Sequence, residues 1–152
     1  MHSESTIVIR RKAADVWCFL ADPLNIPKWD RGVAAVEVNE STPVGVGFEF
    51  TTVGHPGSGP DRGRMTYRVT DVNLAARTCR AELISRTGNA RFIRKAEWHQ
   101  QVEEAPEGSR VTVSADFRLR TRYIWLGPLL FFFGKRAGDK DMTRLKNILE
   151  NP

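Results

Sequence analysis

The stretch ADVWCFLADPLNIPKWD, residues 14–30, decides the fold of this chain. A helix is predicted over about residues 13–21, because the apolar side chains there recur at helical spacing. The Asp-Pro pair that follows ends it, since the residue before a proline avoids helical geometry. A second short helical turn is predicted at residues 24–29 and ends on Trp29. The chain therefore places two small helices near its start, with an aromatic residue at the end of the second.

Strands are predicted on both sides of these helices. One precedes them at residues 5–10, and six follow at residues 33–40, 48–53, 64–72, 78–85, 91–103 and 110–120, separated by Gly, Pro, Asn and Asp. Most of the connections are too short for a parallel crossover, so we expect antiparallel hairpins. Alternation such as Met65, Tyr67 and Val69 keeps one face of each strand apolar. The sequence therefore predicts one sheet with one covered face.

A long helix is predicted to cover that face. Gly127-Pro128 opens it, with proline at a tolerated first position, and it runs to about residue 150, a length of about 34 Å. Its apolar stripe also carries two glycines and an aspartate in the order Leu130, Phe131, Gly134, Gly138, Asp141, Met142, Leu145, Ile148, Leu149. The whole chain, residues 1–152, is predicted to be a single α+β domain.

This order of elements resembles the SRPBCC superfamily, also called the START-like or helix-grip fold. The clearest motif is VW-x-FL-x-D-P-x-x-x-P-x-W, carried here by Val16, Trp17, Phe19, Leu20, Asp22, Pro23, Pro27 and Trp29. Within the superfamily, the chain is most similar to the polyketide cyclase/dehydrase and lipid-transport group. The resemblance implies a curved antiparallel sheet wrapped around the C-terminal helix, with a deep cavity between them. It does not imply one activity, because members of the superfamily handle very different ligands.

Composition and length are those of an ordinary globular domain, with 152 residues, 41% hydrophobic and 27% charged. The longest apolar stretch, residues 123–134, is too short and interrupted to cross a bilayer. We expect no secretion leader and a reducing, cytoplasmic location. Cys18 and Cys79 are interpreted as small buried hydrophobic residues rather than a disulfide.

Several kinds of site are not expected. The net charge of +5 comes from basic residues scattered along the strands, and no nucleic-acid reading motif accompanies them. His2, His55 and His99 include no pair at metal-ligand spacing, which argues against a zinc site. The chain has no nucleotide-binding fingerprint and no serine nucleophile elbow. We therefore predict no metal, no cofactor and no nucleic-acid partner.

A hydrophobic small molecule is the predicted ligand, held in the internal cavity and polyketide-like, aromatic or lipid in character. The predicted cavity residues are Trp29, Phe50, Met65, Tyr67, Arg94, Trp98, Phe117, Gly134, Gly138 and Met142. Glycine in a helix costs about 1 kcal/mol relative to alanine, so the two glycines need a reason. Either they let the helix pack tightly on bulky residues such as Tyr67 and Trp98, or they leave room for the ligand.

Alternatives remain open for three of the polar or amphipathic candidates. Trp29 lies either at the cavity mouth or in the core between helix and sheet. Arg94 either faces inward with Trp98 or extends to the rim if the strand twists. Asp141 either reaches water at the helix edge or is buried against an arginine.

Any catalysis would be acid–base chemistry of the cyclase/dehydrase kind. Tyr67, Arg94 and Asp141 are the candidates for it, and His99 is expected to point outward.

A second hypothesis is a non-catalytic lipid carrier or a protein that docks on a membrane or a second copy. Trp125, Leu129, Phe132 and Phe133 would form an exposed apolar patch for this contact. The competing interpretation is that residues 123–133 form a loop folded over the cavity mouth. The glycine-rich loop at residues 51–64 is interpreted as either a flexible hairpin or a mobile gate.

Overall fold

The computed structural model describes residues 1–38, 43–55 and 63–152. In chain order the elements are β1 (His2–Ile9), α1 (Ala13–Leu20), η1 (Pro23–Asn25), α2 (Ile26–Trp29), β2 (Val33–Val38), β3 (Glu49–Gly54), β4 (Arg64–Asn73), β5 (Thr78–Thr87), η2 (Gly88–Phe92), β6 (Ile93–Ala105), β7 (Gly108–Leu119), η3 (Thr121–Leu126) and α3 (Gly127–Glu150). The labels η1 to η3 denote short 3-10 helices.

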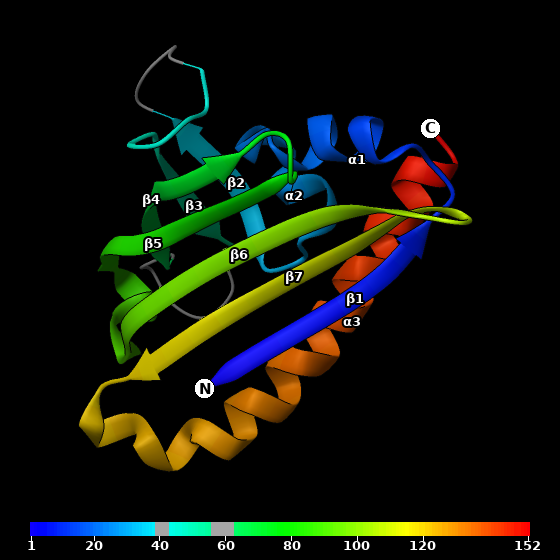
Figure 1. Ribbon diagram of the computed structural model, residues 1–152. Helices are drawn as coiled ribbons and strands as arrows, with labels where there is room; N and C mark the ends of the chain where they lie inside the picture. The colour runs from blue at the N-terminus through cyan, green and yellow to red at the C-terminus, as the bar shows by residue number, and fades with distance from the viewer. Residues whose placement is uncertain (39–42, 56–62) are drawn as a thin grey trace.

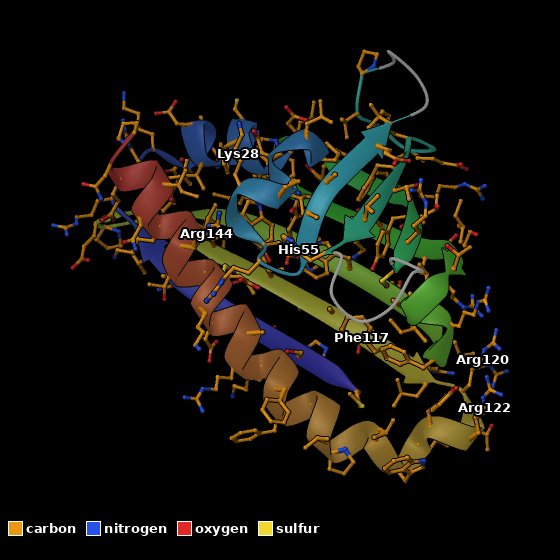
Figure 2. All side chains as sticks on the ribbon, turned by 180° about the vertical axis from the view of Figure 1, so that it is seen from behind. Lys28, His55, Phe117, Arg120, Arg122 and Arg144 are labelled. Carbon is orange, nitrogen blue, oxygen red and sulfur yellow. The ribbon has the colours of Figure 1, made fainter. Side chains whose placement is uncertain are left out.

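The seven strands form one antiparallel sheet in the order β1-β7-β6-β5-β4-β3-β2. Strands β2 to β7 therefore meander, and β1 adds to the far edge by pairing with β7 along its whole length. The sheet curves, and α1, α2 and α3 all lie on its inner side; Figure 2 shows α3 in front of β1 and β7. This is the helix-grip arrangement, and it leaves one sheet face covered and one exposed.

The small helices after β1 are fixed by local hydrogen bonds and by the sheet. The Asp22 carboxylate accepts a hydrogen bond from the Leu24 backbone N–H at 2.9 Å, which caps η1. Gln100 is buried in β6, and its Nε2 donates to the Leu20 carbonyl oxygen at 3.1 Å, which satisfies the end of α1. These contacts hold Trp29, the last residue of α2, against the covered face of the sheet.

Two apolar clusters form the core. One gathers side chains from β1, α1, α2, β6, β7 and α3, including Ile9, Val16, Trp29, Val111 and Leu145. The other lies between β3, β4, β5 and β6 and includes the buried residues Phe50, Tyr67, Val69, Leu83 and Ile93. The alternation predicted for β4 is confirmed, since Met65, Tyr67 and Val69 are buried or half-buried. Among the residues that the structure describes, α3 contributes side chains to the first cluster and none to the second.

The two halves of α3 pack differently. Met142 and Leu145, in the C-terminal half, are fully or nearly buried. The end of this half is tied to β1 and its following turn, because Lys146 Nζ donates to the Val8 carbonyl at 2.9 Å and Arg11 Nε donates to the Leu149 carbonyl at 2.7 Å. The first turns of the helix are largely exposed. Among the described residues, no helix is long and apolar enough to span a bilayer.

Some expectations about local structure are wrong. Residues 123–133 do not form a folded-back loop, because they belong to η3 and to the first turns of α3. Neither η2 nor η3 was predicted. Cys18 is exposed on α1 instead of buried, whereas Cys79 is half-buried, and both are free thiols. The predicted strand end at residues 39–40 and half of the predicted gate, residues 56–62, lie outside the described residues.

Candidate functional site

A cavity of about 580 Å³ lies between the covered face of the sheet and the short helix α2. Most of its wall is apolar or aromatic, with Thr52, His55 and Asp30 as polar exceptions. The lining residues are Ile26, Asp30, Gly32, Val33, Phe50, Thr52, Gly54, His55, Gly63, Met65, Tyr67, Ala90, Phe92, Ile93, Trp98 and Phe117. Such a volume is in the range of small-molecule sites, which are mostly apolar with a few placed polar groups.

A second cavity of about 200 Å³ continues beneath α3. Asp30, Trp98 and Phe117 line both cavities, so these three side chains form the wall that the two spaces share. Predicted residues on the wall of the smaller space are Trp29, Gly134, Gly138 and Met142, together with Asp141. We call the two adjoining spaces together the hollow, which extends from β3 and β4 to the underside of α3.

A third space, of about 560 Å³, is a groove at the end of the sheet where η3 passes into α3. Phe117 lines this outer groove as well as both inner cavities, and Figure 2 shows it on β7 between the sheet and α3. Met1, Ile124 and Phe131 are also on its wall. The outer groove places one end of the hollow beside η3.

Trp29 and Trp98 form the aromatic centre of the site. Trp29 is only 4% exposed and belongs to the core, so its placement in the core, one of the two alternatives from the sequence, is the observed one. One side of it still contacts the smaller cavity. Its ring centroid lies 6.4 Å from that of Trp98, with the planes tilted by 36°, a separation typical of aromatic pairs. Trp29 of the motif thus packs beside the ring of Trp98, which lines both cavities.

Asp30, directly after Trp29, is the charged group that both inner cavities share. Its Oδ1 accepts a hydrogen bond from the Gly32 backbone N–H at 2.8 Å, which fixes the carboxyl at the start of the turn into β2. Burial raises its pKa from 3.8 to about 6, and the nearby carboxylate of Asp141 adds to the rise. A carboxyl with this pKa exchanges a proton near neutral pH, as general acids and bases do.

Asp141 lies across the smaller cavity on α3 and is half-buried. Its Oδ1 accepts a hydrogen bond from the Arg31 backbone N–H at 3.2 Å. Burial raises the pKa of Asp141, while that hydrogen bond and the charges of Arg31 and Arg144 oppose the rise. Neither sequence alternative describes it fully, because it is neither at the open helix edge nor buried in an ion pair.

Tyr67 lies on the wall of the larger cavity and is 8% exposed. Its ring stacks on that of Phe50 in the neighbouring strand, with centroids 5.6 Å apart, and its hydroxyl points toward Met65 Sδ at 3.8 Å. Burial raises the pKa of the hydroxyl well above its ordinary value, and the carboxylate of Asp30 raises it further. Tyr67 therefore stays protonated and offers a hydrogen-bond donor within an apolar wall.

Arg94 does not face the inner cavities, although strict alternation with Trp98 predicts that it does. The pairing of β6 with β7 slips between Ile93 and Lys95, and this irregularity turns Ile93 inward and leaves Arg94 exposed. Arg94 lines only the outer groove. Of the two alternatives for Arg94, the structure shows the one in which it reaches the rim, because the strand pairing is irregular at this point.

His99 follows its neighbour Trp98 on the opposite face of β6. It is half-buried there and lines none of the three spaces. Burial lowers its pKa, and the positive charge of Arg80 on the adjacent strand lowers it further. This agrees with the expectation that His99 points outward.

The two glycines of α3 differ in their surroundings. At Gly134 an added Cβ would meet nothing within 4 Å, whereas at Gly138 it would lie 3.0 Å from Ser5 Oγ. Neither position presses on Tyr67 or Trp98, so tight packing on bulky residues is not their role. Gly134 borders open space in the smaller cavity, and Gly138 makes room for a serine of β1.

Sequence reasoning missed Asp30, His55 and Ala90 as cavity residues. Asp30 stood at the end of the decisive motif, next to Trp29, and that adjacency was the available signal. His55 precedes the glycine-rich loop, where no strand pattern indicates its direction. Within the described part of the chain, no group of three or more His, Cys, Asp or Glu side chains is arranged to hold a metal ion.

Comparison with solved structures finds the same fold over nearly the whole chain. An aromatase/cyclase from a Streptomyces species has a TM-score of 0.76 at 17% identity, covering 99% of this chain and 93% of that one. A START superfamily protein from Mycobacterium smegmatis has a TM-score of 0.75 at 12% identity, covering 98% and 97%. A Thermus thermophilus protein has a TM-score of 0.78 at 12% identity, covering 98% and 97%.

No curated protein sequence matches the chain. The family model described as "Polyketide cyclase / dehydrase and lipid transport" matches residues 1–150. This match and the structural neighbours agree on the helix-grip fold. The chain belongs to the polyketide cyclase / dehydrase and lipid transport family.

Proposed function

We propose that this protein binds a polyketide-like or other aromatic ketone in the joined cavities, with Asp30 as the polar anchor. The observation that carries the proposal is the position of the half-buried Asp30 carboxyl on the wall that two apolar-walled spaces share. A chain of apolar or aromatic units fills such walls by the hydrophobic effect. A carbonyl on that ligand is the group that a protonated carboxyl recognises, because it accepts a hydrogen bond.

Tryptophan fluorescence with acetonaphthone, a bicyclic aromatic ketone, tests ligand binding. Trp98 lines both cavities, and we expect ligand binding to quench its emission. Trp98→Phe should reduce the quench, and Trp29, which lines the smaller cavity, should account for what remains. Trp17→Phe is the matched control, since Trp17 is a core residue that lines neither cavity. If neither acetonaphthone nor a fatty acid gave saturable quenching, the proposed ligand binding would be contradicted.

The role of Asp30 is tested by the pH dependence of that binding. Below about pH 6 the carboxyl is protonated and donates to the ketone, and above it the carboxylate repels the carbonyl oxygen. We expect acetonaphthone to bind about tenfold more weakly at high pH, the equivalent of one lost hydrogen bond. Asp30→Asn should bind equally at both pH values. His55 and Asp141 are unchanged in that variant, so the difference between the two proteins isolates Asp30.

Acid–base catalysis of the cyclase/dehydrase kind is a second candidate function, and the pKa of Asp30 near 6 favours it. In a dehydration, the carboxyl gives its proton to a departing hydroxyl group, which leaves as water. The resulting carboxylate then removes the proton from the adjacent carbon as the double bond forms. The side chains that line the hollow would hold the polyketide-like ligand in a folded conformation for this step.

A β-hydroxy ketone attached to a naphthalene ring tests catalysis directly. If Asp30 is the acid and base, the protein accelerates loss of water from this compound, and Asp30→Asn removes the acceleration. The variant should still bind acetonaphthone, because asparagine keeps the acceptor for the Gly32 N–H. Equal dehydration rates for the parent protein and the variant would leave a binding protein without this activity.

A further inference from the structure

Six of the large apolar side chains described where η3 meets α3 are exposed, Phe131 the least of them at 43%. We call the other five the apolar patch: Ile124, Trp125, Leu129, Phe132 and Phe133. Each is between 55% and 75% exposed, although all five lie within residues 124–133. Single exposed hydrophobic residues are ordinary, but a cluster of this kind marks an interaction surface. Leu129, Phe132 and Phe133 are three and four residues apart, so they share one side of the helix.

Basic residues flank the apolar patch on both sides in the sequence. Arg118, Arg120 and Arg122 precede it, and Lys135 and Arg136 follow it. From residue 117 to residue 138 the chain has no aspartate or glutamate. Within the described residues, these five cations form no ion pair with a carboxylate. Figure 2 shows Arg120 and Arg122 together at the end of the sheet where β7 passes into η3.

The apolar patch and the basic residues beside it together indicate which kind of partner binds this surface. A second copy of the chain would bring the same uncompensated positive charges face to face, which opposes association. An anionic lipid surface offers both an apolar interior for the aromatic side chains and phosphate groups for the cations. Helices that lie in a membrane interface have this composition, and tryptophan is enriched at that depth.

The outer groove opens at the same place. Ile124, a member of the apolar patch, is on its wall together with Gly127 and Pro128. Phe117 lines this groove and both inner cavities. A surface that docks here would therefore lie beside one end of the internal hollow.

We propose that η3 and the first turns of α3 dock the protein on anionic lipid membranes, with Trp125 and Phe132 entering the interface. Arg120, Arg122 and Lys135 contact lipid phosphates around them. Docking does not depend on the function proposed above, so it is measured on protein without added ligand.

Vesicle co-sedimentation tests the docking surface. Vesicles of phosphatidylcholine and phosphatidylglycerol at about three to one should pellet the protein, whereas phosphatidylcholine alone should not. Phe132→Asp should weaken binding about tenfold or more, since it removes one buried aromatic side chain and adds a negative charge. Leu74→Asp is the matched control, because Leu74 is 74% exposed in the β4–β5 turn, away from the apolar patch.

Two further variants address charge and insertion separately. The double variant Lys135→Gln/Arg136→Gln should weaken binding about thirtyfold, since each cation near an anionic surface contributes about fivefold. Trp125 is 75% exposed, whereas Trp17 and Trp29 are buried and Trp98 is half-buried. Its insertion should shift tryptophan emission to shorter wavelength on anionic vesicles, and Trp125→Phe should pellet without this shift.

Three results would overturn the proposal. One is a failure to pellet with the anionic vesicles, and another is pelleting that Phe132→Asp leaves unchanged. The third is a concentration-dependent dimer in sedimentation equilibrium that Phe132→Asp dissociates, which would assign the apolar patch to a second copy. Supportive data require anionic pelleting, its loss in Phe132→Asp and its persistence in Leu74→Asp.

Discussion

At the scale of single residues, Asp30 shows how one backbone contact and burial change the chemistry of a side chain. The Gly32 N–H holds the carboxyl at the junction of the two inner cavities. Loss of water around it disfavours the charged form, and this effect exceeds the stabilisation that the hydrogen bond gives to the carboxylate. The residue therefore costs stability at neutral pH, as residues at functional sites often do.

Asp30→Asn should change how stability depends on pH. The unfolded chain releases this proton near pH 3.8 and the folded chain near pH 6, so the parent protein loses stability as pH rises across that window. The asparagine of the variant still accepts the hydrogen bond from the Gly32 N–H, and it does not titrate, so the variant does not lose stability in this way. We expect the two proteins to be about equally stable near pH 4, and the variant to be about 2 kcal/mol more stable at pH 7. Thermal unfolding at several pH values measures this difference, and parallel curves would contradict it.

Gly134→Ala and Gly138→Ala should have different effects on stability. Both remove the conformational cost of a helical glycine, about 0.5 to 1 kcal/mol. At Gly134 the new methyl group meets no neighbour, so the melting temperature should rise by about 2 °C. At Gly138 it crowds Ser5 Oγ, which is held by a 2.8 Å hydrogen bond to Asp139. The melting temperature of Gly138→Ala should therefore be the lower of the two, and the reverse order would show that Ser5 yields easily.

Residue positions could be predicted from the sequence only where a repeating pattern fixed them. Phe50, Tyr67 and Met65 follow from strand alternation, and the structure places all three on the wall of the larger cavity. Arg94 could not be placed, because an irregular pairing in β6 has no signature in side-chain type. Asp30 could not be singled out, because its importance arises from the meeting of two cavities.

At the scale of elements, α3 combines two kinds of helix in one. Its C-terminal half buries Met142 and Leu145 and is tied to β1 and its following turn by side-chain hydrogen bonds. Its first turns carry Phe132 and Phe133 toward solvent. The periodicity of the sequence predicted the element and its bounds, since the helix begins at Gly127 and ends at Glu150. It could not predict that one half packs and the other does not.

Alanine substitutions in the two halves of α3 should separate its packing role from its role as an exposed surface. Leu145 is fully buried, so Leu145→Ala should destabilise the protein by about 3 kcal/mol. Phe132 is 62% exposed, and Phe132→Ala should change stability by less than about 0.5 kcal/mol. Urea unfolding of both variants measures the two values. A large loss for Phe132→Ala would mean that the apolar patch supports the fold rather than a partner.

At the scale of the whole molecule, the sheet and α3 enclose more space than their side chains fill. The motif at residues 14–30 and the order of elements were enough to predict a helix-grip fold, because that fold follows from local patterns in sequence order. The size and branching of the hollow were not predictable, since they depend on how distant side chains leave space together. An unfilled apolar space lowers stability, which is consistent with selection for binding.

Filling the larger cavity should therefore raise stability and remove binding together. Val33 is half-buried on β2 and lines this cavity, so Val33→Phe should place a ring in the open space near Ile26 and Phe50. The added apolar burial should stabilise the ligand-free protein by about 1 kcal/mol. It should also abolish the rise in melting temperature that saturating acetonaphthone gives the parent protein. Val46→Phe is the control, since Val46 is 71% exposed and should leave both properties unchanged. If Val33→Phe lowered stability and kept ligand binding, the ligand would have to bind outside the larger cavity.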